Sequence, residues 1–267
     1  MSDVSHPVLD RTRRLVFAHR GGSALGPENT LAAFDHGLAC GADGFELDVH
    51  LAADGVPVVI HDAVLDRTTD ASGPVGERTS AELAAVDAGA RFLVDGRQPF
   101  RGQGIGVPTL CDVLARYPGV PLIIELKGRS PVLARRVLQD VRAAGATGRV
   151  CFGGFSNDTL DAIRPEAGVV TSASRWETRL ALYTSWVGLS PTRRYRAFQV
   201  PETKEGHRVV SERFVRLAHR DAVVVQVWTV NEVDDMRRLL TWGVDALITD
   251  RPDRAVDVVR AWNQAAR

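Results

Sequence analysis

The sequence predicts an α/β protein, a (β/α)8 TIM barrel with a β-hairpin extension and a small insertion. Strand-like apolar runs alternate with helical patterns along most of the 267 residues, and this alternation is typical of a parallel sheet. Eight such units over about 250 residues suit a closed barrel. We therefore treat residues 1–267 as a single barrel domain that carries one inserted segment.

Nine short runs have the composition of β-strands, which is one more than the barrel needs. They are residues 15–19, 44–51, 56–61, 121–127, 149–155, 168–174, 197–201, 222–230 and 245–249. Only residues 52–55 join the second run to the third, whereas a parallel crossover needs about a dozen residues. We therefore expect an antiparallel hairpin around Asp54-Gly55, and its removal leaves eight parallel strands.

Helical periodicity, with apolar residues at three- and four-residue spacing, appears between the strands. It is clearest in residues 30–40, 131–144, 158–165, 211–220 and 232–242. Asn29 and Asn231 stand before two of these segments, and Gly41 and Gly243 stand after them. We expect asparagine caps where the two helices begin and glycines where they end.

Residues 62–107 interrupt this alternation. They are rich in Gly, Asp, Arg and Pro and contain one short helical pattern at residues 80–87. A loop of this length inside a compact domain is usually functional or a small inserted unit. We expect a lid-like insertion over one mouth of the barrel.

Two acidic residues share one face of a predicted strand. Glu46 and Asp48 are two positions apart, so both side chains point the same way. The apolar residues between and beside them suit the helix-facing side, which turns the carboxylates toward the barrel interior. Unpaired carboxylates there would be very costly, so they indicate a metal site or a catalytic pair. The alternative is that they face outward against arginines.

Glu125 and Lys127 repeat this spacing at the end of the run 121–127. With Glu46 and Asp48 they give three carboxylates on neighbouring strands, a set of hard oxygen ligands that suits Mg²⁺ or Ca²⁺ better than zinc. Lys127 either pairs with Glu125 or supplies a specific positive charge. The second interpretation is favoured because only two of the 33 basic residues are lysines.

Two histidines stand at strand ends. His19 ends the first strand and precedes glycines that let the backbone approach a ligand closely. His61 ends the return strand of the hairpin, roughly opposite Glu46, so we expect it beside the carboxylates. His50 shares the parity of Glu46, but we interpret it as a rim residue without a role. The remaining histidines are interpreted as surface residues: His6, His36, His207 and His219.

Composition excludes several classes of protein. The formal net charge is zero, which argues against nucleic-acid binding and against a polybasic membrane reader. No apolar run approaches a membrane span, and the first residues lack the apolar core of a signal peptide. Three cysteines without C-x-x-C spacing indicate a reducing compartment. We expect a cytoplasmic protein with a small-molecule substrate and no membrane insertion; its oligomeric state is unknown.

The ordered fragments "AHRGG", "PENTLAAF", "ELDVHLAADGVPVVIHD", "LDRTT", "IELK", "VWTVNEVDDM" and "GVDALITDRP" strongly resemble the glycerophosphodiester phosphodiesterases. The resemblance runs from about residue 15 to residue 253. It implies a TIM barrel with a small insertion after the second catalytic histidine. It also implies metal-dependent hydrolysis of glycerophosphodiesters to glycerol 3-phosphate and an alcohol by His/His acid–base catalysis.

The resemblance assigns roles to residues that match the family's motifs. It implies metal ligands at Glu46, Asp48 and Glu125, catalytic histidines at His19 and His61, phosphate contacts at Arg20 and Lys127, and an aromatic ring beside the glycerol at Trp228. The family's hairpin threonine is replaced by Ala52, and residues 175–196 are the least typical of the family. We expect residues 62–107 to shape the choice of alcohol.

Other functions fit the same architecture. A phospholipase of the C or D type shares related histidine and carboxylate positions but must reach lipid, and no polybasic patch or exposed apolar helix is evident. A barrel that only binds phosphorylated ligands would not need two histidines beside a complete metal set. A metal-dependent sugar isomerase would not need the charges of Arg20 and Lys127.

Overall fold

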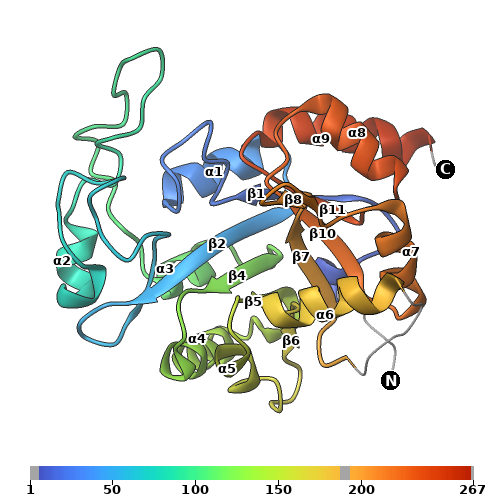
Figure 1. Cartoon of the computed structure of the whole chain (residues 1–267). Helices are drawn as coiled ribbons and strands as arrows, with labels where there is room; N and C mark the ends of the chain where they lie inside the picture. The colour runs from blue at the N-terminus through green and yellow to red at the C-terminus, as the bar shows by residue number, and fades with distance from the viewer. Residues whose placement is uncertain (1–5, 187–192, 266–267) are drawn as a thin grey trace.

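Eight parallel strands form a nearly closed barrel in the computed structural model, which describes residues 6–186 and 193–265 (Figure 1). They are β1 (Leu15–His19), β2 (Gly44–Leu51), β4 (Leu122–Leu126), β5 (Val150–Gly153), β6 (Val170–Thr171), β7 (Ala197–Pro201), β10 (Val224–Trp228) and β11 (Ala246–Thr249). The order around the barrel is β6-β5-β4-β2-β1-β11-β10-β7. A single parallel bridge between Ser172 and Ala197 brings the two ends of this order together.

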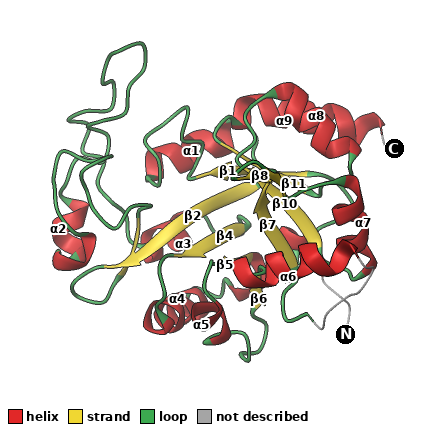
Figure 2. Cartoon of the chain, viewed as in Figure 1, coloured by secondary structure: helices red, strands yellow, loops and turns green. Residues whose placement is uncertain are grey.

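A helix follows each of these strands, on the outside of the barrel (Figure 2). These helices are α1 (Leu31–Ala39), α3 (Leu110–Arg116), α4 (Pro131–Ala143), α5 (Asn157–Asp161), α6 (Arg175–Trp186), α7 (Glu212–Arg220), α8 (Val233–Thr241) and α9 (Pro252–Ala265). The predicted (β/α)8 fold is therefore confirmed. Within the described ranges, no helix is long and apolar enough to cross a membrane.

The short return strand β3 (Pro57–Val59) pairs antiparallel with the end of β2. Val49 lies opposite Val59, and Leu51 lies opposite Pro57, so the register centres the turn on residue 54. The predicted hairpin is confirmed, and with it the reduction of the strand count to eight parallel strands.

The two predicted asparagine caps are wrong. Thr30 caps α1, with its side chain accepting a hydrogen bond from the Ala33 amide, and Glu232 occupies the cap position of α8 without a side-chain bond. The side-chain amides of Asn29 and Asn231 instead donate hydrogen bonds to carboxylates near the barrel mouth, those of the buried Asp48 and the half-buried Asp250. The predicted glycine ends are confirmed, because Gly41 and Gly243 follow α1 and α8 with φ of 94° and 90°.

Residues 62–107 extend away from the barrel beyond the tip of β2 (Figure 1). They contain a 3-10 turn η2 (Val75–Glu77) and a short helix α2 (Ser80–Ala84). Their buried apolar side chains form a small cluster with residues of the hairpin: Ala52, Val58, Ile60, Leu65, Val75, Leu83, Ala88 and Val107. The segment is thus attached to the hairpin by its own apolar contacts.

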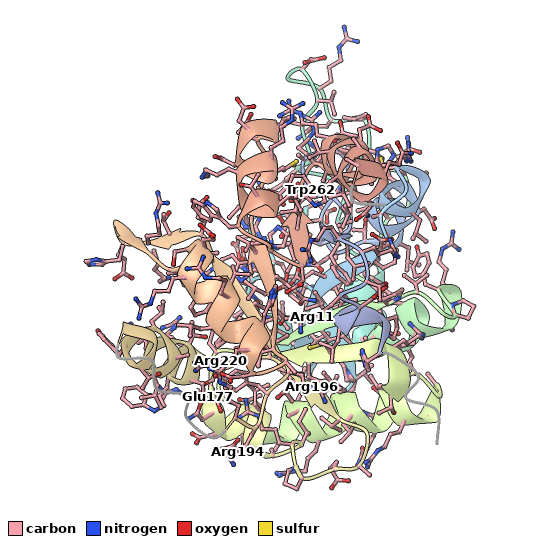
Figure 3. The ribbon with its side chains drawn as sticks, turned by 90° about the vertical axis from the view of Figure 1, so that its right-hand side faces the viewer. Arg11, Glu177, Arg194, Arg196, Arg220 and Trp262 are labelled. Carbon is pink, nitrogen blue, oxygen red and sulfur yellow. The ribbon has the colours of Figure 1, made fainter. Side chains whose placement is uncertain are left out.

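Buried side chains fill the interior of the barrel, and Figure 3 shows the side chains along the whole ribbon in a view turned by 90° from that of Figure 1. One buried cluster lies inside the barrel and includes Val8, Phe17, Ile123 and Ile248. At the start of β2, a Cβ on Gly44 would lie 2.2 Å from the Pro121 carbonyl oxygen. This close approach restricts the position to glycine.

The junction between β6 and β7 is reinforced by a buried arginine. The Arg164 side chain is 5% exposed and donates two hydrogen bonds to Glu177 at 2.9 and 2.7 Å. It also donates to Asp161 at 2.8 Å and to the Ser172 carbonyl oxygen at 3.1 Å. One guanidinium therefore joins α5, the residue after β6 and the first turn of α6.

Candidate active site

The predicted site residues meet at the carboxyl-terminal ends of the parallel strands, where barrel enzymes place their active sites. His19 is the last residue of β1, and Trp228 is the last residue of β10. Glu46 and Asp48 lie in β2, and Glu125 lies near the end of β4. Arg20, His61 and Lys127 each follow a strand.

Glu46, Asp48 and Glu125 offer oxygen atoms that all lie within 4.8 Å of one another. Glu46 is 6% and Asp48 1% exposed, so the alternative in which they face outward is wrong. Burial and the neighbouring Asp48 charge raise the pKa of Glu46 to about 8. Metal–oxygen distances of about 2.0–2.6 Å can be satisfied from three oxygens this close together. The donor set therefore fits a hard divalent cation.

Two cations and one amide hold these carboxylates. Lys127 Nζ lies 2.8 Å from Asp48 Oδ1 and 2.7 Å from Glu125 Oε1, so it pairs with both acids. Arg20 Nε lies 3.2 Å from Asp48 Oδ2, and Asn29 donates to the same oxygen at 2.9 Å. Burial alone would raise the pKa of Asp48, but the charges of Lys127 and Arg20 outweigh this effect and lower the pKa.

His19 is fixed by an acidic residue that the sequence analysis does not single out. Its Nδ1 lies 2.6 Å from Asp250 Oδ1 and its Nε2 lies 3.7 Å from Glu46 Oε2. Ser23 and Asn231 also donate to Asp250. Burial would lower the pKa of His19, but the hydrogen bond to Asp250 and the charge of Glu46 outweigh it, so the pKa is raised. The Nδ1 proton points to Asp250, which leaves Nε2 for the site.

His61 has a similar partner. Its Nδ1 lies 2.6 Å from Asp62 Oδ1, and Arg67 donates to the other oxygen of Asp62 at 2.6 Å. Arg67 also forms a two-pronged pair with Glu28 at 2.7 Å for both bonds, and Glu28 accepts from Arg20 at 3.0 Å. A continuous chain of charged side chains therefore links the second histidine to the predicted phosphate contact.

The position of His61 differs from the expectation in one respect. The hairpin register pairs Val49 with Val59, and by extension Glu46 faces residue 62 and not His61. His61 lies beyond the end of β3 and still lines the same cavity as Glu46. His50, interpreted as a residue without a role, donates from Nε2 to the His61 carbonyl oxygen at 3.0 Å, and thereby positions that segment.

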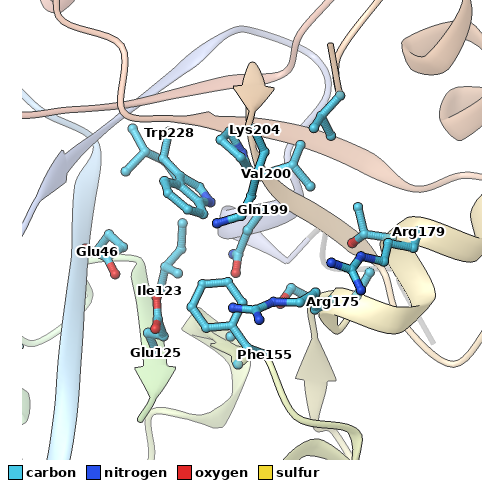
Figure 4. Close-up of a pocket in the computed structure, with 18 of the residues that line it drawn as sticks. Glu46, Ile123, Glu125, Phe155, Arg175, Arg179, Gln199, Val200, Lys204 and Trp228 are labelled. Carbon is cyan, nitrogen blue, oxygen red and sulfur yellow. The ribbon is translucent and has the colours of Figure 1, made fainter. Parts of the chain in front are cut away.

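The site opens into a cavity of about 910 Å³. Figure 4 shows Glu46 and Glu125 on one side and Arg175 and Arg179 on the other. The aromatic ring of Trp228 also lines the cavity, 6.3 Å from the ring of Phe155 in an edge-on arrangement. We call the part of the cavity that carries the acids and histidines its chemical side, and the opposite part its outer side.

The outer side comes from residues 153–155, 172–183 and 199–209. No residue of 62–107 lines the cavity. Its apolar cluster holds this segment against the hairpin, and the expectation that it overhangs the site and shapes the choice of alcohol stays a prediction. Its contribution to the site is the pair Asp62 and Arg67, behind His61. His207, interpreted as a surface residue, lies on the exposed rim of the outer side.

The residues that the sequence analysis missed were next to residues that it named. Asp62 directly follows His61, and Glu28 directly precedes Asn29. Asp250 directly follows β11, at the same mouth as the other strand ends. For Asp250 the sequence contained a usable signal of a site residue, namely a polar residue directly after a predicted parallel strand.

Comparison with known proteins agrees with this geometry. A family model described as the glycerophosphoryl diester phosphodiesterase family matches residues 19–254. A glycerophosphodiester phosphodiesterase of Caldanaerobacter subterraneus subsp. tengcongensis is 32% identical over 259 residues, covering 93% of this chain and 98% of that protein.

Solved structures are similar over the whole barrel. A glycerophosphoryl diester phosphodiesterase domain from Mycobacterium tuberculosis has a TM-score of 0.80 at 26% identity, covering 96% of this chain and all of that one. An Oleispira antarctica phosphodiesterase, solved with the product sn-glycerol-3-phosphate, has a TM-score of 0.74 at 25% identity, covering 93% and 97% of the two chains.

The fold and the site together define an enzyme of the phosphodiesterase class, built on a (β/α)8 barrel. Within that class, the chain belongs to the glycerophosphoryl diester phosphodiesterase family.

Proposed function

We propose that this protein hydrolyses glycerophosphodiesters to glycerol 3-phosphate and an alcohol in a metal-dependent reaction, with His19 and His61 as the acid–base pair. The observation that carries the proposal is that two histidines and three clustered carboxylates line one cavity. Each histidine is held through Nδ1 by its own aspartate.

We assign Glu46, Asp48 and Glu125 as ligands of one divalent cation, Mg²⁺ or Ca²⁺. When bound, such a cation polarises a phosphoryl oxygen and lowers the pKa of a coordinated hydroxyl. The raised pKa of Glu46 supports the assignment, because burial and the nearby charges of Asp48 and Glu125 all disfavour its ionised form. A divalent cation would offset the repulsion from these charges.

Arg20 and Lys127 complete the charge balance. Three carboxylates and one divalent cation sum to minus one, and a phosphodiester adds a further negative charge. Two more positive groups at the same place make phosphate binding favourable, and the planar guanidinium of Arg20 suits forked contacts to phosphate oxygens. The ring of Trp228 then supplies an apolar surface for the glycerol carbons.

In-line displacement at phosphorus requires the entering and leaving oxygens to lie on opposite sides. One histidine accepts the proton of the attacking hydroxyl, which belongs to water or to the neighbouring glycerol carbon. The other donates a proton to the departing alkoxide, and both can do so through Nε2. A nitrophenyl ester, whose leaving group needs no proton, should rescue the variant that lacks the acid more than the variant that lacks the base.

The decisive experiment is a panel of glycerophosphodiesters assayed for released glycerol phosphate with and without EDTA. His19→Ala and His61→Ala should each lower kcat by about 10²–10⁴-fold while the cation stays bound. His36→Ala, on the exposed face of α1, is the matched control and should be unaffected. Turnover that survives EDTA, or near-normal kcat in either histidine variant, would overturn the assignment. Activity only on detergent-dispersed phospholipid would favour a phospholipase instead.

A further inference from the structure

Cationic side chains without acidic partners gather on the outer side of the cavity. Arg175 and Arg179 come from α6, and Lys204 and Arg208 come from a hairpin of β8 (Thr203–Lys204) and β9 (His207–Arg208). In the part of the chain that the structure describes, none of these four has a carboxylate within ion-pair distance. Arg20 and Lys127, on the chemical side of the same cavity, are paired.

Two acidic residues near this outer side form ion pairs with arginines outside the cavity. Glu177, on the first turns of α6, binds Arg164, and Glu202, just before the hairpin, binds Arg238 at 2.8 Å. One carboxylate, that of Glu205 at the hairpin turn, also lines the cavity. Four cations against one acid leave the outer side positive by about three charges, with the exposed His207 beside them.

The stability of α6 does not explain this arrangement. Arg175 and Arg179 are four residues apart, so their side chains lie on the same face, where like charges destabilise a helix by a few tenths of a kcal/mol. Arg175 is also the first residue of α6, where the helix dipole disfavours a positive charge. Two local preferences are violated at once, which is typical of a binding residue.

The same geometry disfavours a cationic alcohol such as choline. Aromatic faces are the usual receptors for quaternary ammonium groups. The guanidinium of Arg175 already lies over the ring of Phe155, 5.0 Å from its centre, as Figure 4 shows. A choline group would enter against Arg175 and Arg179.

We propose that the alcohol moiety of the substrate is a phosphorylated polyol, whose second phosphate binds Arg175, Arg179 and the hairpin cations. This inference rests on the proposed function and specifies its substrate class. Water adds across the bond between phosphorus and the polyol oxygen, giving glycerol 3-phosphate and the polyol phosphate. The cavity, at about 910 Å³, lies at the upper end of the usual range of about 300–1,000 Å³ for small-molecule sites. The cavity therefore has room for the alcohol moiety as well as for the glycerol phosphate.

The test compares two substrates that differ by one phosphate, glycerophosphoinositol and glycerophosphoinositol 4-phosphate. Glycerophosphocholine is the third substrate, because its alcohol moiety is cationic. We expect kcat/KM for the phosphorylated substrate to exceed the others by about 10–100-fold at low ionic strength, since clefts of one charge raise association of opposite charge by about 10–10³-fold. The preference should shrink as salt is raised from 20 to 500 mM.

The double variant Arg175→Gln/Arg179→Gln should remove most of this preference, because it should lower kcat/KM for glycerophosphoinositol 4-phosphate much more than kcat/KM for glycerophosphoinositol. The matched control, Arg97→Gln/Arg135→Gln, removes the same charge from exposed positions outside the cavity and should keep it. Equal turnover of all three substrates, or an effect of the control equal to that of the double variant, would overturn the inference while leaving the phosphodiesterase proposal intact. If no glycerophosphodiester is cleaved, the proposed function itself fails.

Discussion

Each candidate catalytic histidine is hydrogen-bonded to its own aspartate, His19 to Asp250 and His61 to Asp62. Asp250 accepts from His19 and is itself held by Ser23 and Asn231. These partners fix the ring orientation and decide which nitrogen carries the proton. The hydrogen bonds also keep the aspartates charged. Burial would raise the pKa of Asp250, but the hydrogen bond from His19 outweighs it and lowers the pKa to about 2.

Asp250→Asn should shift the pH dependence of activity in a defined direction. The carboxylate raises the pKa of His19, so its removal should lower that pKa and move the His19-controlled limb of the kcat/KM profile to lower pH. kcat should fall by less than in His19→Ala, because the imidazole remains. The profile is measured from pH 5 to 9, alongside an NMR titration of His19.

The control for that variant is Asp257→Asn, on the exposed face of α9, where the side chain is 80% exposed. It should leave the profile unchanged. An Asp250→Asn profile that superimposes on that of the parent protein would show that Asp250 does not tune His19.

Metal binding should stabilise the fold through the carboxylate cluster. A cation at 100 times its Kd should raise the free energy of unfolding by about 2.7 kcal/mol, read as a rise in Tm on adding Mg²⁺ or Ca²⁺ to EDTA-treated protein. Glu125→Gln should weaken or abolish this rise, because it removes one ligand charge. Glu166→Gln, on the surface, should retain it. An equal rise in both variants would contradict the assigned ligands.

At the scale of elements, the features set by side-chain parity and connection length were predictable. The alternation in β2 placed Glu46 and Asp48 on one face, and the four-residue connection required the hairpin. The asparagine caps were wrong because an asparagine before a helix can cap it or reach a buried carboxylate, and local sequence does not distinguish these. The outer side of the cavity was not predicted because residues 172–183 and 199–209 meet there through tertiary packing alone.

Gly44→Ala should test the tight start of β2. The added methyl group would meet the Pro121 carbonyl oxygen and the ring of Phe17, and overpacking of this kind costs about 1–3 kcal/mol. Urea unfolding should show a lower midpoint with little change in slope. Gly148→Ala, where the added carbon meets nothing within 4 Å, should stay within about 0.5 kcal/mol of the parent protein. Similar losses in both would refute the close-approach argument.

At the scale of the whole molecule, the barrel is weakest where β6 meets β7. β6 has two residues, and the junction consists of one bridge together with backbone bonds from Ala173 to Ala197 at 2.8 Å and from Arg196 to Thr171 at 3.0 Å. Arg164 reinforces this junction from the side. The closure of the barrel therefore depends on a buried charge cluster as well as on the sheet.

Arg164→Met should destabilise the protein by about 3–5 kcal/mol, because it removes a buried cation and leaves Glu177, which is only 14% exposed, without its partner. Arg142→Met is the matched control: its pair with Glu166 is 43% and 48% exposed, and such pairs contribute about 0–1 kcal/mol. Equilibrium denaturation compares the two. Hydrogen exchange should also become faster in β6 and the first turn of α6. Equal stability of the two variants would refute a structural role for Arg164 at the junction.

The division of the cavity into two sides has an evolutionary consequence. The groups assigned to bond breaking come from β1 to β4, whereas the groups assigned to holding the alcohol come from α6 and the β8–β9 hairpin. Mutations can therefore accumulate in the second set without disturbing the first. A lineage can change the phosphodiesters that it accepts by remodelling α6 and the β8–β9 hairpin, and a protein engineer can graft these elements onto a relative and leave the reaction chemistry untouched.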